Sequence, residues 1–107
     1  MLKNKQNDEN VEKAEVILSL FIDYHIFLNS HLNLKMLSDI SGFSKQEVKY
    51  LCSEIIEMPL DDLISYHRLR FLKNIPLSSP YRNKNIWKMG GFKSRRAYER
   101  HLKNIVF

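Results

Sequence analysis

Histidines and cysteines, which often carry catalysis or bind metals, are few in this sequence and lie far apart. The 107 residues include four histidines and one cysteine. The histidines lack the paired spacing that places two imidazoles on one helix face in zinc proteases, and a lone cysteine cannot build a thiolate zinc site. We therefore expect no metal and no cofactor. The four histidines are His25, His31, His67 and His101.

Cys52 and the adjacent pair Asp61 and Asp62 favour structural roles over catalytic ones. Cys52 falls on an apolar helical stripe, where a buried thiol behaves as a small, inert hydrophobe. Neighbouring residues on a helix point in different directions, so the two aspartates suit the positive N-terminal end of a helix dipole rather than an acid and base pair. Because no catalytic constellation is recognisable, we expect a protein that is not an enzyme.

Basic side chains are the functional groups that the sequence concentrates. Residues 1–62 carry six basic and eleven acidic residues, net −5, whereas residues 63–107 carry eleven basic residues and one acidic residue, net +10. This asymmetry favours a polyanionic partner, with nucleic acid ahead of an anionic membrane surface or an acidic protein. The single cysteine suits a reducing compartment, and no apolar run approaches the roughly 20 residues of a membrane helix. We expect a cytoplasmic protein without a membrane segment.

Helices must position these groups, because apolar residues recur at steps of three and four along the chain. The spacing predicts a first amphipathic helix over about 11–29. Asn33 can cap a second helix, which stops at Gly42, a residue suited to a left-handed turn. The second helix is expected to carry Leu34, Leu37 and Ile40 on one side.

Ser44 and Glu47 form a capping box that predicts a third helix from Lys45. The buried stripe of this helix is expected to be Val48, Leu51, Cys52, Ile55 and Ile56. Its outward face is polar and carries Lys45, Gln46, Lys49 and Tyr50.

The C-terminal half predicts three further elements. Pro59 suits the first turn of a long fourth helix, and the prolines and serines of 76–80 form a connector. A helical turn over about 84–89 follows. Ser94 can cap a last helix running towards Asn104, with an inward face made of Tyr98, Leu102 and Ile105.

A weak internal repeat supports this layout. Four residues of the second helix and its turn recur in order 49 residues later: Leu37, Ile40, Gly42 and Phe43 as Ile86, Met89, Gly91 and Phe92. We therefore predict an all-α fold with two helix-turn-helix subdomains joined by a long linking helix. The predicted boundaries are a disordered or solvated tail over 1–12, a first lobe over 13–58, the linking helix over 59–75 and a second lobe over 76–107.

The ordered residues resemble the C-terminal DNA-binding domain of the AraC/XylS family of bacterial transcription regulators. The resemblance covers roughly residues 29–104 and is carried in the first lobe by Leu34, Leu37, Ser38, Ile40, Gly42, Ser44, Val48 and Leu51. In the linking helix it is carried by Leu63, Ile64, Tyr66, Arg68 and Leu69. In the second lobe the matching residues are Ile86, Gly91, Phe92, Ser94, Tyr98, Arg100, Leu102 and Lys103.

The resemblance implies a homeodomain-like, AraC-type arrangement in which each lobe places its second helix in one of two successive major grooves. The residues expected to contact bases are Lys45, Gln46, Lys49, Tyr50, Arg95, Arg96 and Arg100. Those expected to contact phosphates are Ser44, Arg82, Lys84, Lys88, Lys93, Ser94 and Lys103. Arg68 is expected to support the fold through hydrogen bonds rather than to touch DNA.

The sequence departs from the family pattern at several positions. Trp87 stands where the family usually has alanine, so the indole must either rotate outward or force the second lobe to open. Asn83 and Cys52 replace usual apolar residues, and Pro76 replaces leucine near the end of the linking helix. The family pattern usually continues into a last short helix, which we expect this chain to lack.

The resulting hypothesis is a sequence-specific, DNA-binding transcription regulator whose partner is double-stranded DNA and whose chain has no small-molecule ligand domain. The first alternative is a degenerate helix-turn-helix module that binds a protein such as RNA polymerase or another regulator. The acidic first half, Trp87 and Asn83 favour this alternative, with the first helix as the docking face. The second alternative is non-specific nucleic-acid binding through the basic half.

Overall fold

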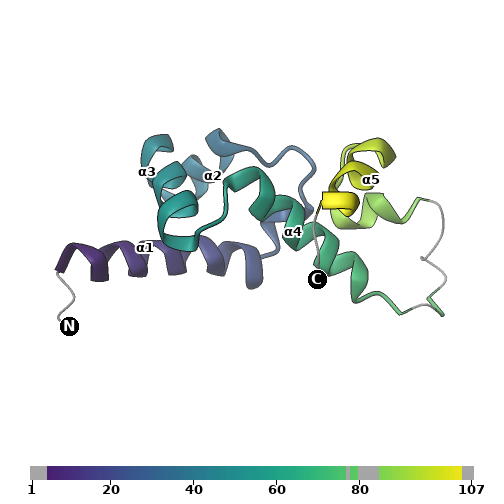
Figure 1. Cartoon of the computed structure of the whole chain (residues 1–107), viewed down its shortest axis with the longest axis horizontal. Coiled ribbons are helices and arrows are strands. Elements are labelled where there is room, and N and C mark those ends of the chain that lie inside the picture. The colour runs from purple at the N-terminus through teal and green to yellow at the C-terminus, as the bar shows by residue number, and fades with distance from the viewer. Residues whose placement is uncertain (1–4, 77, 80–84, 105–107) are drawn as a thin grey trace. The chain divides into compact units, whose positions relative to one another are not determined.

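The computed structural model describes residues 5–76, 78–79 and 85–104, and within these residues the chain is helical with no strand. The all-α prediction is therefore confirmed. The described part of the chain has eight helical elements, five of them α-helices, and Figure 1 labels the α-helices along the course of the chain. In order the eight elements are α1 (Lys5–Ile22), η1 (Ile26–Leu28), α2 (Leu34–Ser41), α3 (Lys45–Tyr50), η2 (Leu51–Ile56), α4 (Leu60–Lys73), η3 (Ile86–Gly90) and α5 (Arg95–Asn104).

The first helix begins and ends earlier than the predicted range of 11–29. Helix α1 already starts at Lys5, so the predicted tail over 1–12 is helical from that residue. Asp8 and Glu9 lie near its N-terminal end, where carboxylates stabilise the helix dipole. The helix stops after Ile22 because His25 adopts a left-handed conformation with φ 52°, and the chain continues into the short η1 turn.

The described residues fall into two compact units. Among them, unit 1 comprises residues 5–25 and 33–63, and unit 2 comprises residues 26–32 and those from 64 onward. The division differs from the predicted lobes in two ways, because residues 26–32 belong to unit 2 and the boundary falls inside helix α4. The predicted linking helix over 59–75 corresponds to α4, which ends at Lys73.

The core of unit 1 is built from helices α1, α2 and α3 together with η2, a π-helical continuation of α3. Helix α1 packs against η2. The buried side chains are Ala14, Ile17, Phe21, Leu37, Val48, Leu51, Cys52 and Leu63. Ile40, predicted on the same side of its helix as Leu37, is 48% exposed. Leu37, three residues earlier, is fully covered and marks the inward face of this short helix.

The core of unit 2 is a cluster of Leu69, Leu72 and Phe92. Six partly buried side chains pack against it, namely Phe71, Ile75, Ile86, Trp87, Ala97 and Tyr98. The indole of Trp87 has therefore not rotated away from the core. Its Nε1 is buried and has no hydrogen-bond partner among the described residues, and the Lys88 ammonium lies 5.5 Å from the ring centroid.

Arg68 explains why residues 26–32 belong to unit 2. Its Nε donates to the Phe27 carbonyl at 2.8 Å and its Nη2 donates to the Asn29 carbonyl at 2.9 Å. The guanidinium also lies 5.6 Å from the centroid of the Phe92 ring. Burial lowers the pKa of Arg68, and the two carbonyls satisfy donors that would otherwise be desolvated. The predicted supporting role of Arg68 is thus confirmed.

Candidate nucleic-acid interface

A three-residue turn joins helix α2 to helix α3. Helix α2 begins at the cap residue Asn33, whose side chain accepts from the Met36 N–H at 2.9 Å. It ends at Gly42, which has φ 82° and donates its N–H to the Ser38 carbonyl at 3.0 Å. The Ser38 hydroxyl donates to the Phe43 carbonyl at 2.5 Å, so the turn is held from both sides.

Helix α3 starts at the predicted residue with the serine half of the predicted capping box, and the Glu47 side chain pairs with helix α1 in place of the other half. The Ser44 hydroxyl accepts from the Glu47 N–H at 3.1 Å. The Glu47 carboxylate forms an ion pair with Lys13 of α1, with 2.5 Å between Nζ and Oε2. Lys13 also lies 5.8 Å from the centroid of the Phe43 ring. The hydrogen bond to Glu47 raises the pKa of Lys13. Through Lys13, helix α1 therefore contacts both the loop at residues 42–44 and the first helical turn of α3.

This role of Lys13 was not predicted. The ion pair joins residues 34 positions apart, and no local spacing in the sequence connects them. The sequence signal is that Lys13 is a cation among the carboxylates of residues 8–15, which does not identify its partner.

Helix α3 presents the polar face that the sequence predicted. Lys45, Gln46, Lys49 and Tyr50 are exposed, whereas Val48 is fully buried. The burial continues in η2 at Leu51. Contact of the exposed side chains with bases stays a prediction.

The turn before helix α5 repeats the backbone design of the first turn. Gly91 has φ 92° and donates to the Lys88 carbonyl at 3.1 Å. A phenylalanine follows each glycine, and a serine caps each following helix. The Ser94 hydroxyl accepts from the Ala97 N–H at 3.1 Å, the same distance as in the Ser44 cap. The predicted repeat is thus present in the local geometry, with one additional residue in the second turn.

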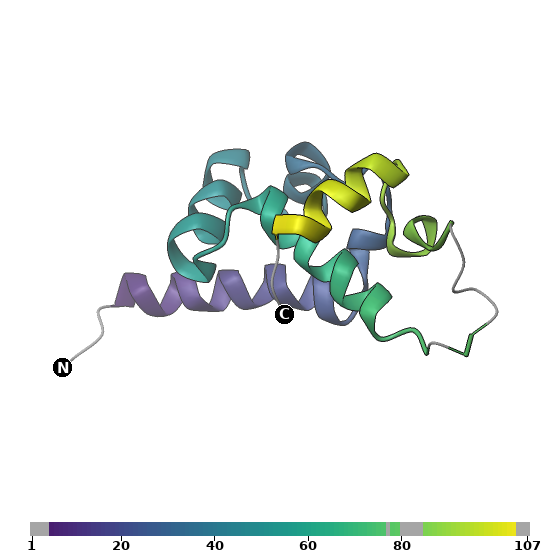
Figure 2. The ribbon, with the colours of Figure 1, turned by 45° about the vertical axis from the view of Figure 1, so that its right-hand side comes forward.

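Helix α5, which Figure 2 shows at the C-terminal end of the described chain, is strongly amphipathic. Phe92 contacts Tyr98 and His101, with ring centroids 5.5 Å and 6.2 Å apart. These two residues occupy the inward face, so Leu102, which was predicted to face inward, is 47% exposed. Ile105, predicted on the same face, lies outside the described residues.

The exposed face of α5 is basic. Arg95, Arg96, Arg100 and Lys103 are all exposed, and the last three line a shallow hollow together with Glu99. Arg95 pairs with Glu99 at 3.7 Å, but both side chains are more than half exposed, so the pair is weak and the guanidinium can exchange it for another anion.

The predicted phosphate contacts are only partly described. Ser44, Lys88, Lys93, Ser94 and Lys103 are exposed, as such a role requires. Arg82 and Lys84 lie outside the described residues, as does Asn83. These five exposed residues lie in the turn before α3, in the turn before α5, in η3 and in α5.

Other kinds of site find no support in the described residues. No three His, Cys, Asp or Glu side chains there lie close enough to hold a metal ion. Among the described helices, none has the length and apolar character needed to cross a membrane.

Comparison with known proteins identifies no relative of this chain. No protein-family model matches the chain, and neither the curated proteins nor the solved structures contain a match to it. The functional argument therefore depends on the residues and geometry described above.

Proposed function

We propose that this protein binds double-stranded DNA sequence-specifically and regulates transcription in the bacterial cytoplasm, as the resemblance to AraC/XylS regulators implies. In this proposal α3 and α5 each enter a major groove. The observation that carries it is the repeated unit of left-handed glycine, phenylalanine and serine cap. In both copies this unit begins a helix whose outward face is basic or hydrogen-bonding.

The exposed side chains have the chemistry that base recognition needs. An arginine can donate two parallel hydrogen bonds to guanine O6 and N7, and a glutamine can pair in the same way with adenine. Arg95, Arg96 and Arg100 supply the first chemistry on α5, and Gln46 supplies the second on α3. Lys88 and Lys93 flank the second turn and suit phosphates, which fix position without specifying sequence.

The test is selection of bound sequences from a random duplex pool, followed by titration of the winning duplex and a scrambled control at two salt concentrations. A motif of two half-sites about one helical turn apart, preferred by roughly 10³-fold or more, is the expected result. A motif with a single half-site would restrict the function to one of the two helices.

Two other outcomes would contradict the proposal. Equal binding of both duplexes with the same steep salt dependence would indicate a non-specific polyanion surface. Absence of binding to either duplex would favour the alternative of a helix-turn-helix module that serves a protein partner such as RNA polymerase.

A further inference from the structure

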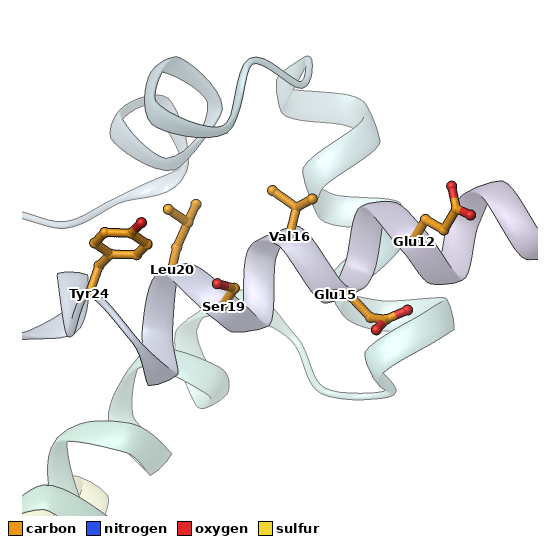
Figure 3. A pocket seen from close by; sticks show the side chains of 6 residues that line it. All are labelled: Glu12, Glu15, Val16, Ser19, Leu20 and Tyr24. Atoms are coloured by element: carbon orange, nitrogen blue, oxygen red, sulfur yellow. The ribbon is translucent and has the colours of Figure 1, made fainter.

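The outward face of helix α1, together with the turn that follows it at residues 23–24, carries two rows of side chains that the DNA-binding proposal does not use. One row has a spacing of four residues and consists of Glu12, Val16, Leu20 and Tyr24. The neighbouring row consists of Glu15, Ser19 and Asp23. Figure 3 shows Val16 and Leu20 along the helix and Tyr24 just past its end, with Ser19 and Glu15 beside them. An open hollow of about 540 Å³ is lined by residues of both rows.

The first row exposes apolar surface to water. Val16 is 44% exposed and Tyr24 is 72% exposed, and Leu20 between them is half-buried. Core packing does not require these side chains, because Ala14, Ile17 and Phe21 already form the inward face of α1. A continuous apolar row on a helix surface favours burial against a partner.

The second row is polar and is held in place. The Ser19 hydroxyl donates to the Asp23 carboxylate at 2.9 Å. Parallel rows with a spacing of four residues form the ridges and the groove into which the ridge of another helix packs. Val16 and Leu20 lie one turn apart on α1, roughly 6 Å at 1.5 Å per residue, and Tyr24 follows in the turn just after the helix ends at Ile22.

The charge around the two rows is negative. Residues 8–23 contain five carboxylates, all exposed, and one cation. That cation, Lys13, is paired with Glu47. The five carboxylates are Asp8, Glu9, Glu12, Glu15 and Asp23, so a complementary partner must be basic.

We propose that this face of α1 docks a basic amphipathic helix of another protein, with apolar side chains in the groove beside Val16, Leu20 and Tyr24 and with lysines or arginines facing Glu12 and Glu15. This function goes beyond DNA binding and does not depend on it. Symmetric pairing of this face with the same face of a second copy is disfavoured because it would bring five carboxylates from each chain to the interface. Three apolar side chains on one helix also offer much less than the roughly 1,200 Å² that a stable dimer buries.

The test uses the full chain and a fluorescein-labelled helical peptide of 18 residues, with leucines on one face and lysines along its flanks. A peptide with glutamates in place of the lysines is the charge control. Fluorescence anisotropy is expected to show micromolar binding of the lysine peptide, at least tenfold tighter than binding of the glutamate peptide. Raising the salt concentration should weaken the binding.

Two double variants of α1, each with a control variant elsewhere, separate the apolar and acidic contributions to peptide binding. Val16→Gln combined with Tyr24→Gln should weaken peptide binding about tenfold, whereas Ile40→Gln, an exposed apolar residue of α2, should leave it unchanged. Glu12→Gln combined with Glu15→Gln should weaken binding several-fold and flatten its salt dependence. Glu54→Gln, which removes one exposed charge from η2, should not alter it.

The proposal is overturned if the lysine peptide does not bind, if the glutamate peptide binds equally well, or if the α1 variants bind like the parent. It is also overturned if sedimentation equilibrium shows a dimer that Val16→Gln with Tyr24→Gln dissociates, because the occupant is then a second copy. Circular dichroism of each variant verifies that it is folded. Binding of the α1 variants to the selected duplex should be unchanged, which separates failure of this proposal from failure of DNA binding.

Discussion

Single exposed residues of helix α5 differ in the kind of contact that they can make with DNA. A guanidinium is a planar donor with a fixed geometry, whereas an ammonium on a flexible stem acts as a point charge. Arg100 and Lys103 lie three residues apart and line the same hollow. They therefore offer a matched comparison of base contact with phosphate contact.

Replacing Arg100 with alanine should cost about 1 to 3 kcal/mol of binding free energy at one or two base pairs and relax the preference there. Replacing Lys103 should weaken binding to all sequences alike. It should also reduce, by about one, the steepness with which the logarithm of the binding constant falls with the logarithm of the salt concentration. Titration of each variant against single-base substitutions of the selected duplex measures both effects. Arg70→Ala removes the same charge from helix α4 and serves as the control. Uniform weakening by Arg100→Ala would assign it to a phosphate.

The buried thiol of Cys52 should make the free energy of unfolding depend on pH. Burial raises the pKa of its thiol from 9.0 to about 11. Because the unfolded chain releases this proton at lower pH than the folded chain, stability falls as the pH rises through the interval between the two values. The free energy of unfolding should drop by about 2 kcal/mol more between pH 8 and pH 10.5 in the parent than in Cys52→Val. Urea titration at both pH values measures it, and parallel losses in the two proteins would refute this role of the thiol.

At the scale of elements, the two glycine turns share a backbone conformation but differ in their surroundings. Both glycines have positive φ, at 82° for Gly42 and 92° for Gly91. A Cβ at Gly42 would meet no atom within 4 Å, whereas a Cβ at Gly91 would lie 2.4 Å from the Phe27 carbonyl oxygen. The left-handed strain is therefore common to both positions, and the steric clash is specific to Gly91.

Gly42→Ala should lower the free energy of unfolding by about 1 kcal/mol, which is the cost of a left-handed alanine. Gly91→Ala should lower it by about 2 to 4 kcal/mol, because the segment around Phe27 must also move. Urea unfolding of the two variants gives this comparison directly. An equal loss in both would mean that the contact between Gly91 and Phe27 does not form in solution.

At the scale of the whole molecule, the two units contain separate natural reporters of folding. Trp87, the only tryptophan, packs on the core of unit 2, and Cys52, the only cysteine, is buried in unit 1. Helix α4 contributes residues to both units, since the division falls between Leu63 and Ile64. Fluorescence and thiol reactivity can therefore follow each unit in one protein without labels.

Gly91→Ala should shift the urea midpoint of Trp87 fluorescence further than the midpoint of Cys52 reactivity towards a thiol reagent, because its clash lies within unit 2. Gly42→Ala should show the opposite order. Coincident shifts of both reporters in both variants would show instead that α4 couples the two units into one cooperative transition.

Local interactions were the part of the structure that could be predicted from the sequence. The caps at Asn33, Ser44 and Ser94 and the glycine turns were predicted at the correct residues, because each depends on groups within four or five positions along the chain. The exposed faces of α3 and α5 followed from helical periodicity. The all-α class follows from the same local signals.

Other features depend on contacts between distant residues, and only the tertiary structure decided them. Residues 26–32 join unit 2 because Arg68 hydrogen-bonds to the Phe27 and Asn29 carbonyls, about 40 positions away. Lys13 braces the start of α3 through Glu47. Leu102 is exposed because His101 and Tyr98 already cover Phe92. Capping and periodicity are short-range effects that amino-acid order determines directly, whereas these pairings depend on which surfaces remain uncovered after the helices pack.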